Sequence, residues 1–569
     1  MKKQWLTHTH YSTEVVSELQ QSLTVDETIA KLLALRGIST FDEAKTFFRP
    51  SLSTLHDPFL MKGMDTAIHR INKAIENNEK VLVFGDYDVD GTTAVALVYS
   101  FFKSYVKDIR YYIPDRYSEG YGISFKSIDY AKENNYSLII ALDCGIKAND
   151  KIEYANERQI DFIICDHHLP GDLIPKAVAV LDPKQLDCDY PYKELSGCGI
   201  GFKLAQAFCI KNNIDIETVY HFLDLVVTSI AADVVPITDE NRVLAHYGLK
   251  QLNANPRPGI KALLAFGKGD NKELDISTLV FTIAPRINAA GRIEHGSKAV
   301  ELLISTTEEA TAFSKKINDT NLHRRDLDVS ITDEAIEMLE LDPITPFRKS
   351  VVLYNPSWHK GVVGIVASRL IEKFYKPTIV LTLSNDVVSG SARSVKDFDV
   401  YTAIENCSHL LEQFGGHKFA AGLTMKPENV KAFIEAFENE VARTIKPDML
   451  TPTVEIDLEL KLDDINDKLL RILKQFAPHG PHNMTPVFYS KGVLDTGFAK
   501  IVGQNHLKLE VYQPNAQLTK IEAIAFSKGD FLNFLQRKIP VDIVYKIKEN
   551  EFRGQTSIQL MIEEIRVSE

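Results

Sequence analysis

Three aspartates stand at alternate positions directly after an apolar run, in the order Val81–Phe84, Gly85, Asp86, Asp88 and Asp90. The apolar run predicts a buried strand, and where extended backbone continues beyond it, alternation places the three carboxylates on one side. Like charges at that spacing repel one another unless protons or metal ions neutralise them. The triplet therefore predicts a site for hard divalent cations, which prefer oxygen ligands.

A calcium-binding helix-loop-helix hand and a solvated acidic turn are the two alternatives for the triplet. The calcium-binding hand begins with the same D-x-D-x-D-G pattern, but it has a bidentate acid at its twelfth position. Counted from Asp86, that position is Leu97, and a strand instead of a helix is expected before the triplet. The triplet alone leaves the solvated acidic turn open.

Acids and histidines follow later apolar runs in the same way. Asp143 and Asp166 each close a run, and His167 and His168 come directly after Asp166. A lone histidine is more often structural, but an adjacent pair at the end of a buried strand is hard to explain by core packing. Mixed imidazole and carboxylate ligation favours manganese, with magnesium or another first-row divalent ion as a substitute.

Asp233 is a further candidate ligand, because it is the only charged residue between Asp224 and Asp239. An isolated carboxylate in so apolar a segment requires a partner. Taken alone, a helix cap or a buried ion pair explains Asp233 as well as a metal ion does.

Strand and helix signals alternate between residues 79 and 183. This alternation predicts an open parallel sheet, in which ligands gather outside the carboxyl ends of the strands. The triplet, Asp143 and Asp166 therefore belong to one edge of the sheet. The expected strands are Lys80–Phe84, Ile109–Pro114, Leu138–Asp143, Phe162–Asp166 and Ala177–Asp182.

The expected fold class is α/β, with a parallel-sheet domain and a smaller α/β domain joined by a long helix and followed by an OB-like β-barrel. The segment Thr306–Leu341 is charged and helix-favouring, and short strands replace helix signals after Pro452. The expected divisions are an N-terminal segment at 1–60, the parallel-sheet domain at 61–300, the connecting helix at 301–345, the second α/β domain at 346–450 and the barrel at 451–569.

Composition is that of a globular protein, with 44% hydrophobic and 25% charged residues. No stretch approaches the roughly 20 apolar residues of a membrane span, and no signal core follows the N-terminus, so we expect a cytoplasmic protein.

The six cysteines show no C-x-x-C spacing, which disfavours zinc knuckles and disulfides. A formal net charge of −12 argues against coating of nucleic acid by the whole surface but leaves room for a local basic groove.

Four motifs together resemble those of the DHH phosphoesterase family. They are D-Y-D-V-D-G-T-T at 86–93, L-D-C-G at 142–145, D-H-H at 166–168 and A-A-D-V at 231–234. Two further segments, Pro285–Arg292 and Gly415–Gly422, are similar to the RecJ branch, the single-strand-specific 5′-to-3′ DNA exonucleases. The resemblance covers nearly the whole chain, the barrel included.

The resemblance implies a centre of two Mn²⁺ or Mg²⁺ ions. Such a pair, about 4 Å apart, generates hydroxide and stabilises charge on the attacking and leaving oxygens, so no protein nucleophile is required. Asp166 would orient the ligands, and His168 would contact the scissile phosphate. Phe84 stands where many DHH phosphatases carry a histidine, so the second metal site is less well defined than the first. The implied ligands are Asp90, Asp143, His167 and Asp233 for one ion, and Asp86 and Asp88 with the shared Asp143 for the other.

Candidate phosphate-binding residues stand in the Pro285–Arg292 segment. Arg286 and Arg292 carry planar guanidinium groups suited to phosphate oxygens, and Asn288 between them adds a hydrogen bond. A surface ion pair is the alternative for either arginine alone.

A hydroxyl-rich loop in the second domain resembles the RecJ pocket for a 5′ end. By that resemblance Ser391 and Arg393 are the contacts and Arg116 reaches across from the first domain, while a simple turn is the alternative. Trp358 and His417 belong to the same expected face, where bases stack. For Trp358 alone, core packing is an equally good explanation.

The barrel carries basic and aromatic residues that suit single-stranded nucleic acid, although a solvated charged surface explains them nearly as well. They are Lys500, His506, Lys508, Tyr512, Lys520, Lys546, Lys548 and Arg553.

We therefore expect a processive, metal-dependent exonuclease that releases mononucleotides from the 5′ end of single-stranded DNA during repair and recombination, with the polarity implied by the resemblance alone. Family analogy adds a single-strand-binding protein and a helicase as partners. One alternative is a DHH-family phosphodiesterase acting on short oligoribonucleotides or cyclic dinucleotides, against which the barrel counts. The other is a non-catalytic single-strand-binding scaffold, against which the complete set of motif acids counts.

Overall fold

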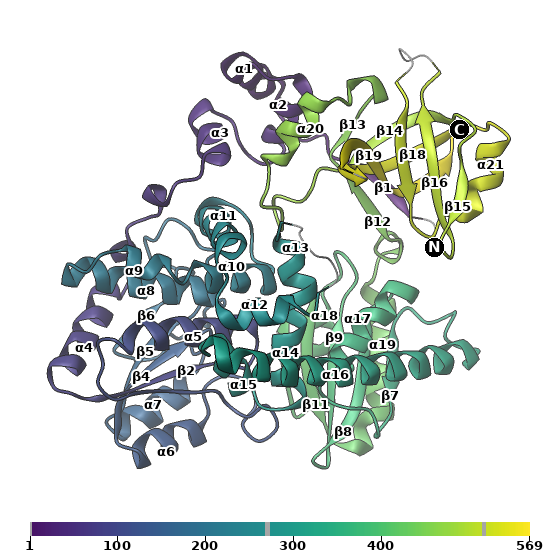
Figure 1. The fold of residues 1–569 in the computed structure, drawn as a ribbon. Coiled ribbons are helices and arrows are strands. Elements are labelled where there is room, and N and C mark those ends of the chain that lie inside the picture. Colours follow the sequence, from purple (N-terminus) through teal and green to yellow (C-terminus); the bar gives the residue numbers. More distant parts are fainter. Residues whose placement is uncertain (1–2, 268–272, 515–518, 553, 569) are drawn as a thin grey trace.

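The protein forms two α/β domains joined by a long helix, and a C-terminal barrel (Figure 1). The computed structural model describes residues 3–267, 273–514, 519–552 and 554–568. Arg553, one of the basic residues expected on the barrel, lies outside these residues. Within them, no helix combines the length and the apolar composition needed to cross a membrane.

The first α/β domain is built on a five-stranded parallel sheet in the order β3-β2-β4-β5-β6, which confirms the expected fold class. The central strands β2, β4 and β5 are apolar along most of their length because helices cover both faces. Helices α5 (Val89–Phe102) and α8 (Gly197–Asn212) bury one face, and α6 (Phe125–Glu133) and α7 (Asn149–Glu157) bury the other. The strands are β2 Lys80–Gly85, β3 Ile109–Tyr112, β4 Tyr136–Leu142, β5 Asp161–Cys165 and β6 Ala179–Leu181.

The chain changes from strand to helix inside the aspartate triplet. Asp86 follows β2, Asp88 caps α5 by accepting the Gly91 N–H at 3.0 Å, and Asp90 lies in the first turn of the helix. The expectation of extended backbone through all three aspartates is therefore wrong. A Cβ at Gly91 would lie 2.5 Å from the Asp86 carbonyl oxygen, so glycine and the capping aspartate together let the helix begin directly against the strand end.

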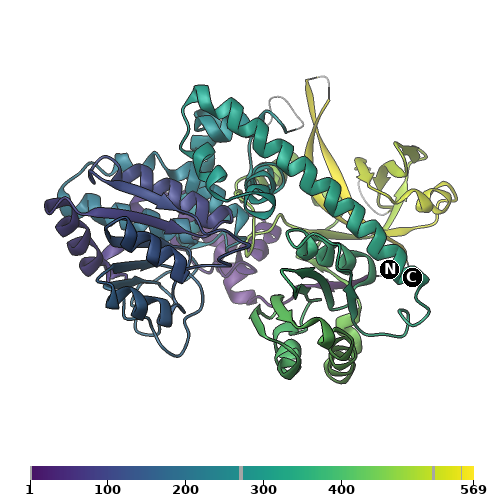
Figure 2. The ribbon, with the colours of Figure 1, turned by 90° about the horizontal axis from the view of Figure 1, so that it is seen from below.

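Helix α16 (Thr307–Leu341) connects the two α/β domains, and Figure 2 shows it running from one to the other. The second domain has a sheet in the order β10-β11-β9-β8-β7, in which only β7 and β8 are parallel. Helix α17 (Val363–Phe374) packs with α16 on one face, and α19 (Val430–Thr444) packs on the other. The strands are β7 Val351–Tyr354, β8 Thr378–Ser384, β9 Val387–Arg393, β10 Gln413–His417 and β11 Ala420–Met425.

The C-terminal strands close into a barrel in the order β14-β18-β19-β17-β16, with β14 and β16 paired. This strand order, with helix α21 (Leu532–Gln536) between the third and fourth barrel strands, is that of an OB-fold. The strands are β14 Phe488–Asp495, β16 His506–Tyr512, β17 Ile521–Ala525, β18 Val541–Phe552 and β19 Gln555–Val567, and β15 Lys500–Val502 extends the sheet beside β16.

The N-terminal segment belongs to the barrel unit. Strand β1 (Gln4–Thr7) pairs in parallel with β12 (Thr453–Ile456). Three helices, α1 (Thr13–Leu23), α2 (Glu27–Ala34) and α3 (Phe41–Phe48), join the hydrophobic cluster that contains the barrel strands. The two ends of the chain therefore build one unit (Figure 1).

Arg242 on helix α11 (Asp239–Ala254) fastens this unit to the first α/β domain. Its buried guanidinium donates to the carbonyl oxygens of Phe47 and of the four residues from 475 to 478 at 2.9–3.4 Å, and it lies 3.8 Å from the centroid of the Phe47 ring. Nearby, the Ile237 N–H donates to the Pro481 carbonyl at 2.8 Å. The Arg242 side chain thus binds carbonyl groups of both α3 and the segment 475–478.

We predict that Arg242→Met loosens the barrel unit. Methionine fills similar space but donates no hydrogen bond, and each buried carbonyl left without a donor costs about 1–3 kcal/mol. Amide hydrogen exchange at residues 475–484 should become faster, while exchange in β2 and β4 stays unchanged. Arg471→Met, at an exposed position on the same unit, is the matched control. Equal exchange in the two variants would contradict the assignment.

Candidate metal centre and phosphate-binding site

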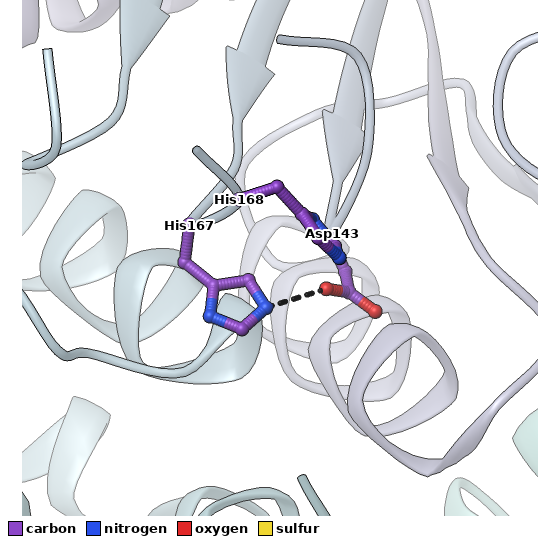
Figure 3. Close-up of side chains that lie close together, drawn as sticks. All are labelled: Asp143, His167 and His168. Carbon is purple, nitrogen blue, oxygen red and sulfur yellow. Dashed lines mark ion pairs between the residues drawn. The ribbon is translucent and has the colours of Figure 1, made fainter. Parts of the chain in front are cut away.

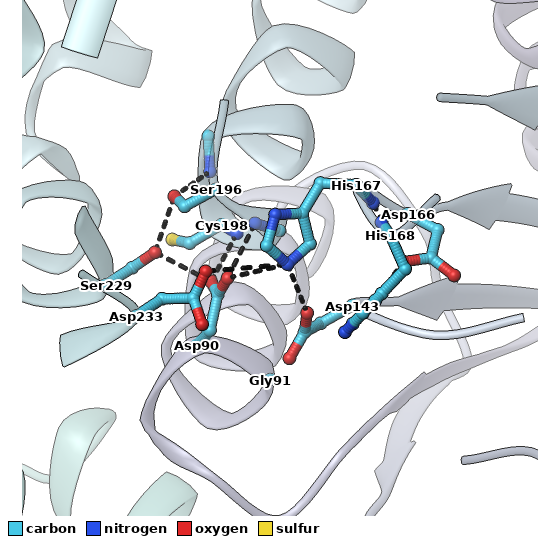
Figure 4. Close-up of polar contacts among 12 residues, drawn as sticks. Asp90, Gly91, Asp143, Asp166, His167, His168, Ser196, Cys198, Ser229 and Asp233 are labelled. Carbon is cyan, nitrogen blue, oxygen red and sulfur yellow. Dashed lines mark hydrogen bonds and ion pairs between the residues drawn. The ribbon is translucent and has the colours of Figure 1, made fainter. Parts of the chain in front are cut away.

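Asp90 is held by the N-terminus of α8. The N–H groups of Gly197 and Cys198 donate to its two carboxylate oxygens at 2.7 Å, and the Ser229 hydroxyl donates at 2.6 Å (Figure 4). Ser196 caps the helix by accepting the Gly199 N–H at 3.1 Å. The unsatisfied amides and the dipole at a helix N-terminus stabilise a buried carboxylate, so the Asp90 side chain is fixed in orientation.

Asp143 follows β4 in the left-handed backbone region, with φ of 60°. Its N–H donates to the Cys165 carbonyl at 2.8 Å, which ties the turn to the neighbouring strand. A Cβ at Gly197 would lie 2.7 Å from the Asp143 Cβ, so only glycine lets α8 begin this close to the carboxylate. Backbone strain of this kind is characteristic of functional sites.

His167 points its Nε2 at three carboxylates. The Nε2 atom lies 3.2 Å from Asp143 Oδ1, 3.6 Å from Asp233 Oδ2 and 3.7 Å from Asp90 Oδ2 (Figures 3 and 4). Burial lowers the pKa of His167, which favours the neutral imidazole that binds metal ions. The implied first metal set of Asp90, Asp143, His167 and Asp233 is thus brought together in space.

Asp86 and Asp88 lie beside this set, where burial and neighbouring negative charge disfavour the ionised form of both carboxyl groups. Asp86 is fully buried, and neither of its oxygens has a hydrogen-bond partner among the described residues. Burial and then the charge of Asp88 raise the pKa of Asp86 well above its usual range, and burial and then Asp90 raise that of Asp88. Orphaned carboxylate oxygens in this position fit a cation.

The other two implied acidic ligands, Asp143 and Asp233, also have raised pKa values. Burial, followed by the charge of Asp90, raises the pKa of Asp233 to about 8 and that of Asp143 well above its usual range. Two groups of described residues bring ligand atoms within 4.8 Å of one another: Asp90, His167 and Asp233, and Asp143, His167 and His168. Oxygen and imidazole donors in this arrangement fit Mn²⁺ or Mg²⁺.

His168 is oriented by Asp166. Its Nδ1 and the Asp166 Oδ1 are 2.7 Å apart, and Asp166 also accepts the N–H groups of His167 and Ile146. Burial lowers the pKa of His168, but the bond to Asp166 outweighs it and raises that pKa to about 9. Tyr121 places its hydroxyl 3.4 Å from the His168 Nε2. The raised pKa favours the charged form of His168 at neutral pH, and the bond to Asp166 fixes the orientation of the ring.

Four arginines form a cluster where the two domains meet. Burial, and then the charges of Arg116, Arg393 and Arg324, lower the pKa of Arg292 to about 10. The Arg292 Nη1 donates to the carbonyl of Gly361 in the second domain at 3.3 Å. Buried guanidinium groups that repel one another favour an anion between them.

Ser391 and Arg393 lie on β9, with the Arg393 Nη1 2.9 Å from the Ser391 Oγ. A Cβ at Gly364, near the start of α17, would lie 2.9 Å from that Oγ and 3.1 Å from Arg393 Nη2. The glycine keeps both polar groups open. Arg116 approaches from the first domain, its guanidinium 5.1 Å from the centroid of the Tyr87 ring.

Two expected substrate residues are bonded to protein groups instead. Arg286 donates to Asn318 Oδ1 and to the carbonyls of Thr282 and Phe266, which occupies the guanidinium with protein acceptors. Trp358 is only 4% exposed and its indole N–H donates to Glu334 at 2.8 Å. The expectation that Trp358 offers a stacking surface is wrong, because its ring belongs to the core between α16 and the second sheet.

His417 ends β10 in the second domain and is exposed. Its pKa is lowered first by partial burial and then by the charge of His168 in the first domain. Asn288 lies with Arg292 on α14 (Ala284–Ile293), and both line the space between the domains. The second domain thus faces the candidate metal centre.

Several contributing residues were not found by sequence reasoning. Gly197, Cys198 and Ser229 hold Asp90, Ser196 caps the helix that supplies the two amides, and Tyr121 contacts His168. The available signal was a serine followed by small residues at 196–199, which is typical of a capped helix that approaches a ligand closely. Tyr121 stands in a loop with no comparable pattern.

Family models match three segments of the chain: the DHH family N-terminal domain at 80–230, the DHHA1 domain at 348–443 and the RecJ OB domain at 456–564. The single-stranded-DNA-specific exonuclease RecJ of Bacillus subtilis is 36% identical over 561 residues, which are 97% of this chain and 70% of that protein. The Escherichia coli protein of the same name is 32% identical over 557 residues, 94% of this chain and 95% of that one.

Solved structures give the same relationship. RecJ from Thermus thermophilus in complex with Mn²⁺ matches with a TM-score of 0.85 and 25% identity, over 100% of this chain and 80% of that one. An exonuclease RecJ bound to manganese matches with a TM-score of 0.60 and 30% identity, over 70% of this chain and 98% of that one.

We predict that the metal-free protein loses stability as pH rises from 5 to 8. The raised pKa of Asp233, about 8, means that the folded state holds a proton which the unfolded chain releases near pH 4. The contribution to stability is therefore complete below about pH 4 and is lost as pH rises toward 8. Thermal unfolding in a chelator measures this.

Mn²⁺ replaces the proton, so it should raise Tm more at pH 8 than at pH 6. Asp233→Asn removes one of the groups with a raised pKa and should reduce the dependence of Tm on pH in the chelator. A metal-free Tm as high at pH 8 as at pH 5 would refute the raised pKa.

Proposed function

This chain belongs to the RecJ family of DHH proteins, and from that premise we propose that it is a metal-dependent exonuclease that hydrolyses single-stranded DNA from the 5′ end. The observation that carries the proposal is the pairing of the acid and histidine centre with a buried arginine and serine pocket on the facing domain. The first suits phosphodiester hydrolysis, and the second suits a terminal phosphate.

Divalent ions bound to the centre would supply a hydroxide nucleophile and stabilise charge on the leaving oxygen. We propose that Asp90, Asp143, His167 and Asp233 hold one ion, and that Asp86 and Asp88 with Asp143 hold a second. The α8 amides keep Asp90 oriented for this role.

We propose that His168 binds the scissile phosphate through Nε2. The raised pKa of about 9 keeps the ring charged at neutral pH, and Asp166 fixes its plane through Nδ1. A charge-assisted hydrogen bond to a phosphate oxygen is stronger than a neutral one and shorter in length. Tyr121 limits rotation of the ring from the other side.

We propose that Ser391 and Arg393 bind the 5′-terminal phosphate, with Arg116 contributing from the first domain. Arg393 is largely withdrawn from water, which lowers its pKa, and no carboxylate lies among its hydrogen-bond partners in the described residues. A phosphate monoester supplies the missing negative charge. His417, opposite His168, would line the path between this pocket and the metal centre.

The barrel presents an aromatic surface of the kind that stacks bases. Phe498 and Phe526 are 41% and 51% exposed, and Lys500 and Lys508 lie 4.7 and 5.9 Å from the centroid of the Phe498 ring. His506 packs edge-on against Phe526. We propose that this surface on β15 to β17, called the barrel surface, binds the strand away from the cleavage site.

The barrel also weighs against a phosphodiesterase for short oligoribonucleotides or cyclic dinucleotides, and the RecJ relationship does not favour that alternative.

We propose a helicase and a single-strand-binding protein as partners, because a single-strand-specific enzyme depends on others to separate and protect its substrate. We further propose that it acts in the cytoplasm during DNA repair and recombination.

We predict that Mn²⁺ supports release of mononucleotides from the 5′ end of a labelled single strand, and that a duplex is resistant. Asp143→Asn should reduce the rate by at least about 10³-fold, since it removes a charged ligand shared by both proposed ions. Arg393→Gln should reduce the preference for a 5′-phosphate over a 5′-hydroxyl end. Release of mononucleotides from the 3′ end would overturn the polarity.

We predict that Phe498→Ala combined with Phe526→Ala weakens binding to a long single strand. Each lost stacking contact costs about 1–3 kcal/mol, so affinity should fall by at least about tenfold. Hydrolysis of a trinucleotide should be unchanged. Phe534→Ala, at an exposed position on α21, is the matched control. Unchanged affinity for long strands in the double variant would exclude the barrel surface from binding.

A further inference from the structure

A cavity of about 240 Å³ lies beside the candidate metal centre, between the two α/β domains. Ala232, which precedes the proposed ligand Asp233, lines one side, and Ile365 of α17 lines another. The polar wall is formed by Asn288, Arg292 and Arg324. The cavity thus shares Arg292 with the site that the proposed function uses, and residues of both domains line it.

Arg324 reaches this cavity from the connecting helix α16 with its hydrogen-bonding capacity largely unused. Its Nη2 donates to Asn321 Oδ1 at 2.8 Å, and its Nε is buried without a hydrogen-bond partner among the described residues. Its Nη1 lies 3.6 Å from Asp328 Oδ2, but the same oxygen is bound at 2.7 Å by Arg369. Arg324 and Arg369 therefore share one carboxylate, so two cations face a single anion.

The other described residues that line the cavity supply no negative charge to balance Arg324. Of the described residues that line the cavity, none is acidic, and Arg292 is a second cation there. The proposed 5′-terminal phosphate accounts for Arg116 and Arg393 and leaves Arg324 with only the Asp328 carboxylate that it shares with Arg369. A buried guanidinium with a free donor fits a phosphate oxygen, because uncompensated charge in a buried site is costly.

We propose that Arg324, with Asn288, binds the backbone phosphate of the linkage that follows the scissile one. The enzyme then holds the strand on both sides of the bond that it cuts. This inference rests on the proposed function, since it assigns a second phosphate within the same substrate. Asp328 and Asn321 act as positioning residues for the guanidinium.

The proposal predicts how activity depends on substrate length. A 5′-phosphorylated dinucleotide has only the scissile linkage, whereas a trinucleotide adds the linkage assigned to Arg324. One charge-assisted contact is equivalent to about a tenfold change. Wild-type kcat/KM should therefore rise about tenfold from dinucleotide to trinucleotide, and Arg324→Gln should abolish that rise without changing the rate on the dinucleotide.

A neutral methylphosphonate at the second linkage of the trinucleotide provides the second measurement. It should reduce wild-type kcat/KM about tenfold and leave Arg324→Gln unaffected, while Arg324→Lys should recover part of the rise. Arg325→Gln, the same change at the exposed neighbouring position, is the matched control and should behave as wild type.

The outcomes separate this inference from the function on which it rests. If the wild-type protein releases no mononucleotide from the 5′ end of any of these substrates, the proposed function fails. If wild type is active but Arg324→Gln lowers kcat/KM equally on both lengths, or the methylphosphonate costs both proteins the same, the assignment of Arg324 is overturned. Circular dichroism and Tm of each variant identify loss of folding.

Discussion

The repulsion among carboxylates buried at one edge of the parallel sheet is the constraint on which the rest of the structure depends. The fold relieves it unequally. Asp90 receives two backbone amides and a hydroxyl, and Asp166 receives amides and the charged ring of His168. Asp86 and Asp143 are left with raised pKa values and must gain protons or cations. The chain therefore stabilises the carboxylates of Asp90 and Asp166 and leaves those of Asp86 and Asp143 without comparable compensation.

The arginine cluster has the opposite imbalance, because its buried positive charges lack a matching number of anions. The arginines and the aspartates do not neutralise one another. Arg292 is held against the Gly361 carbonyl, and Gly364 leaves Ser391 and Arg393 open without bringing an acid near. Arginines free to reach the aspartates would form ion pairs and neutralise both sets. Among the described residues no ion pair joins these arginines to the aspartates of the metal centre, so both uncompensated sets of charge persist. A phosphodiester with its metal ions satisfies both together.

Sequence patterns predicted the sheet and the acids, because periodicity and strand-end position are local properties. The backbone path through Asp88 was not predicted, since a capping aspartate resembles one more ligand until the helix start is seen. Trp358 was ambiguous because an aromatic ring packs in a core as readily as against a base. Arg324 was missed because a charged residue on a long polar helix gives no sign of which neighbour it faces. Packing between distant segments decides such cases.

The attachment of the barrel unit differs in kind from its proposed contacts with DNA. Arg242 meets backbone carbonyls inside a buried junction, where dissolved ions screen little. The lysines of the barrel surface meet solvent, and their attraction to phosphate weakens as counterions are added. Salt therefore releases the strand before it releases the barrel. Since residues from both ends of the chain build that unit, its attachment to the first α/β domain does not depend on a bound strand.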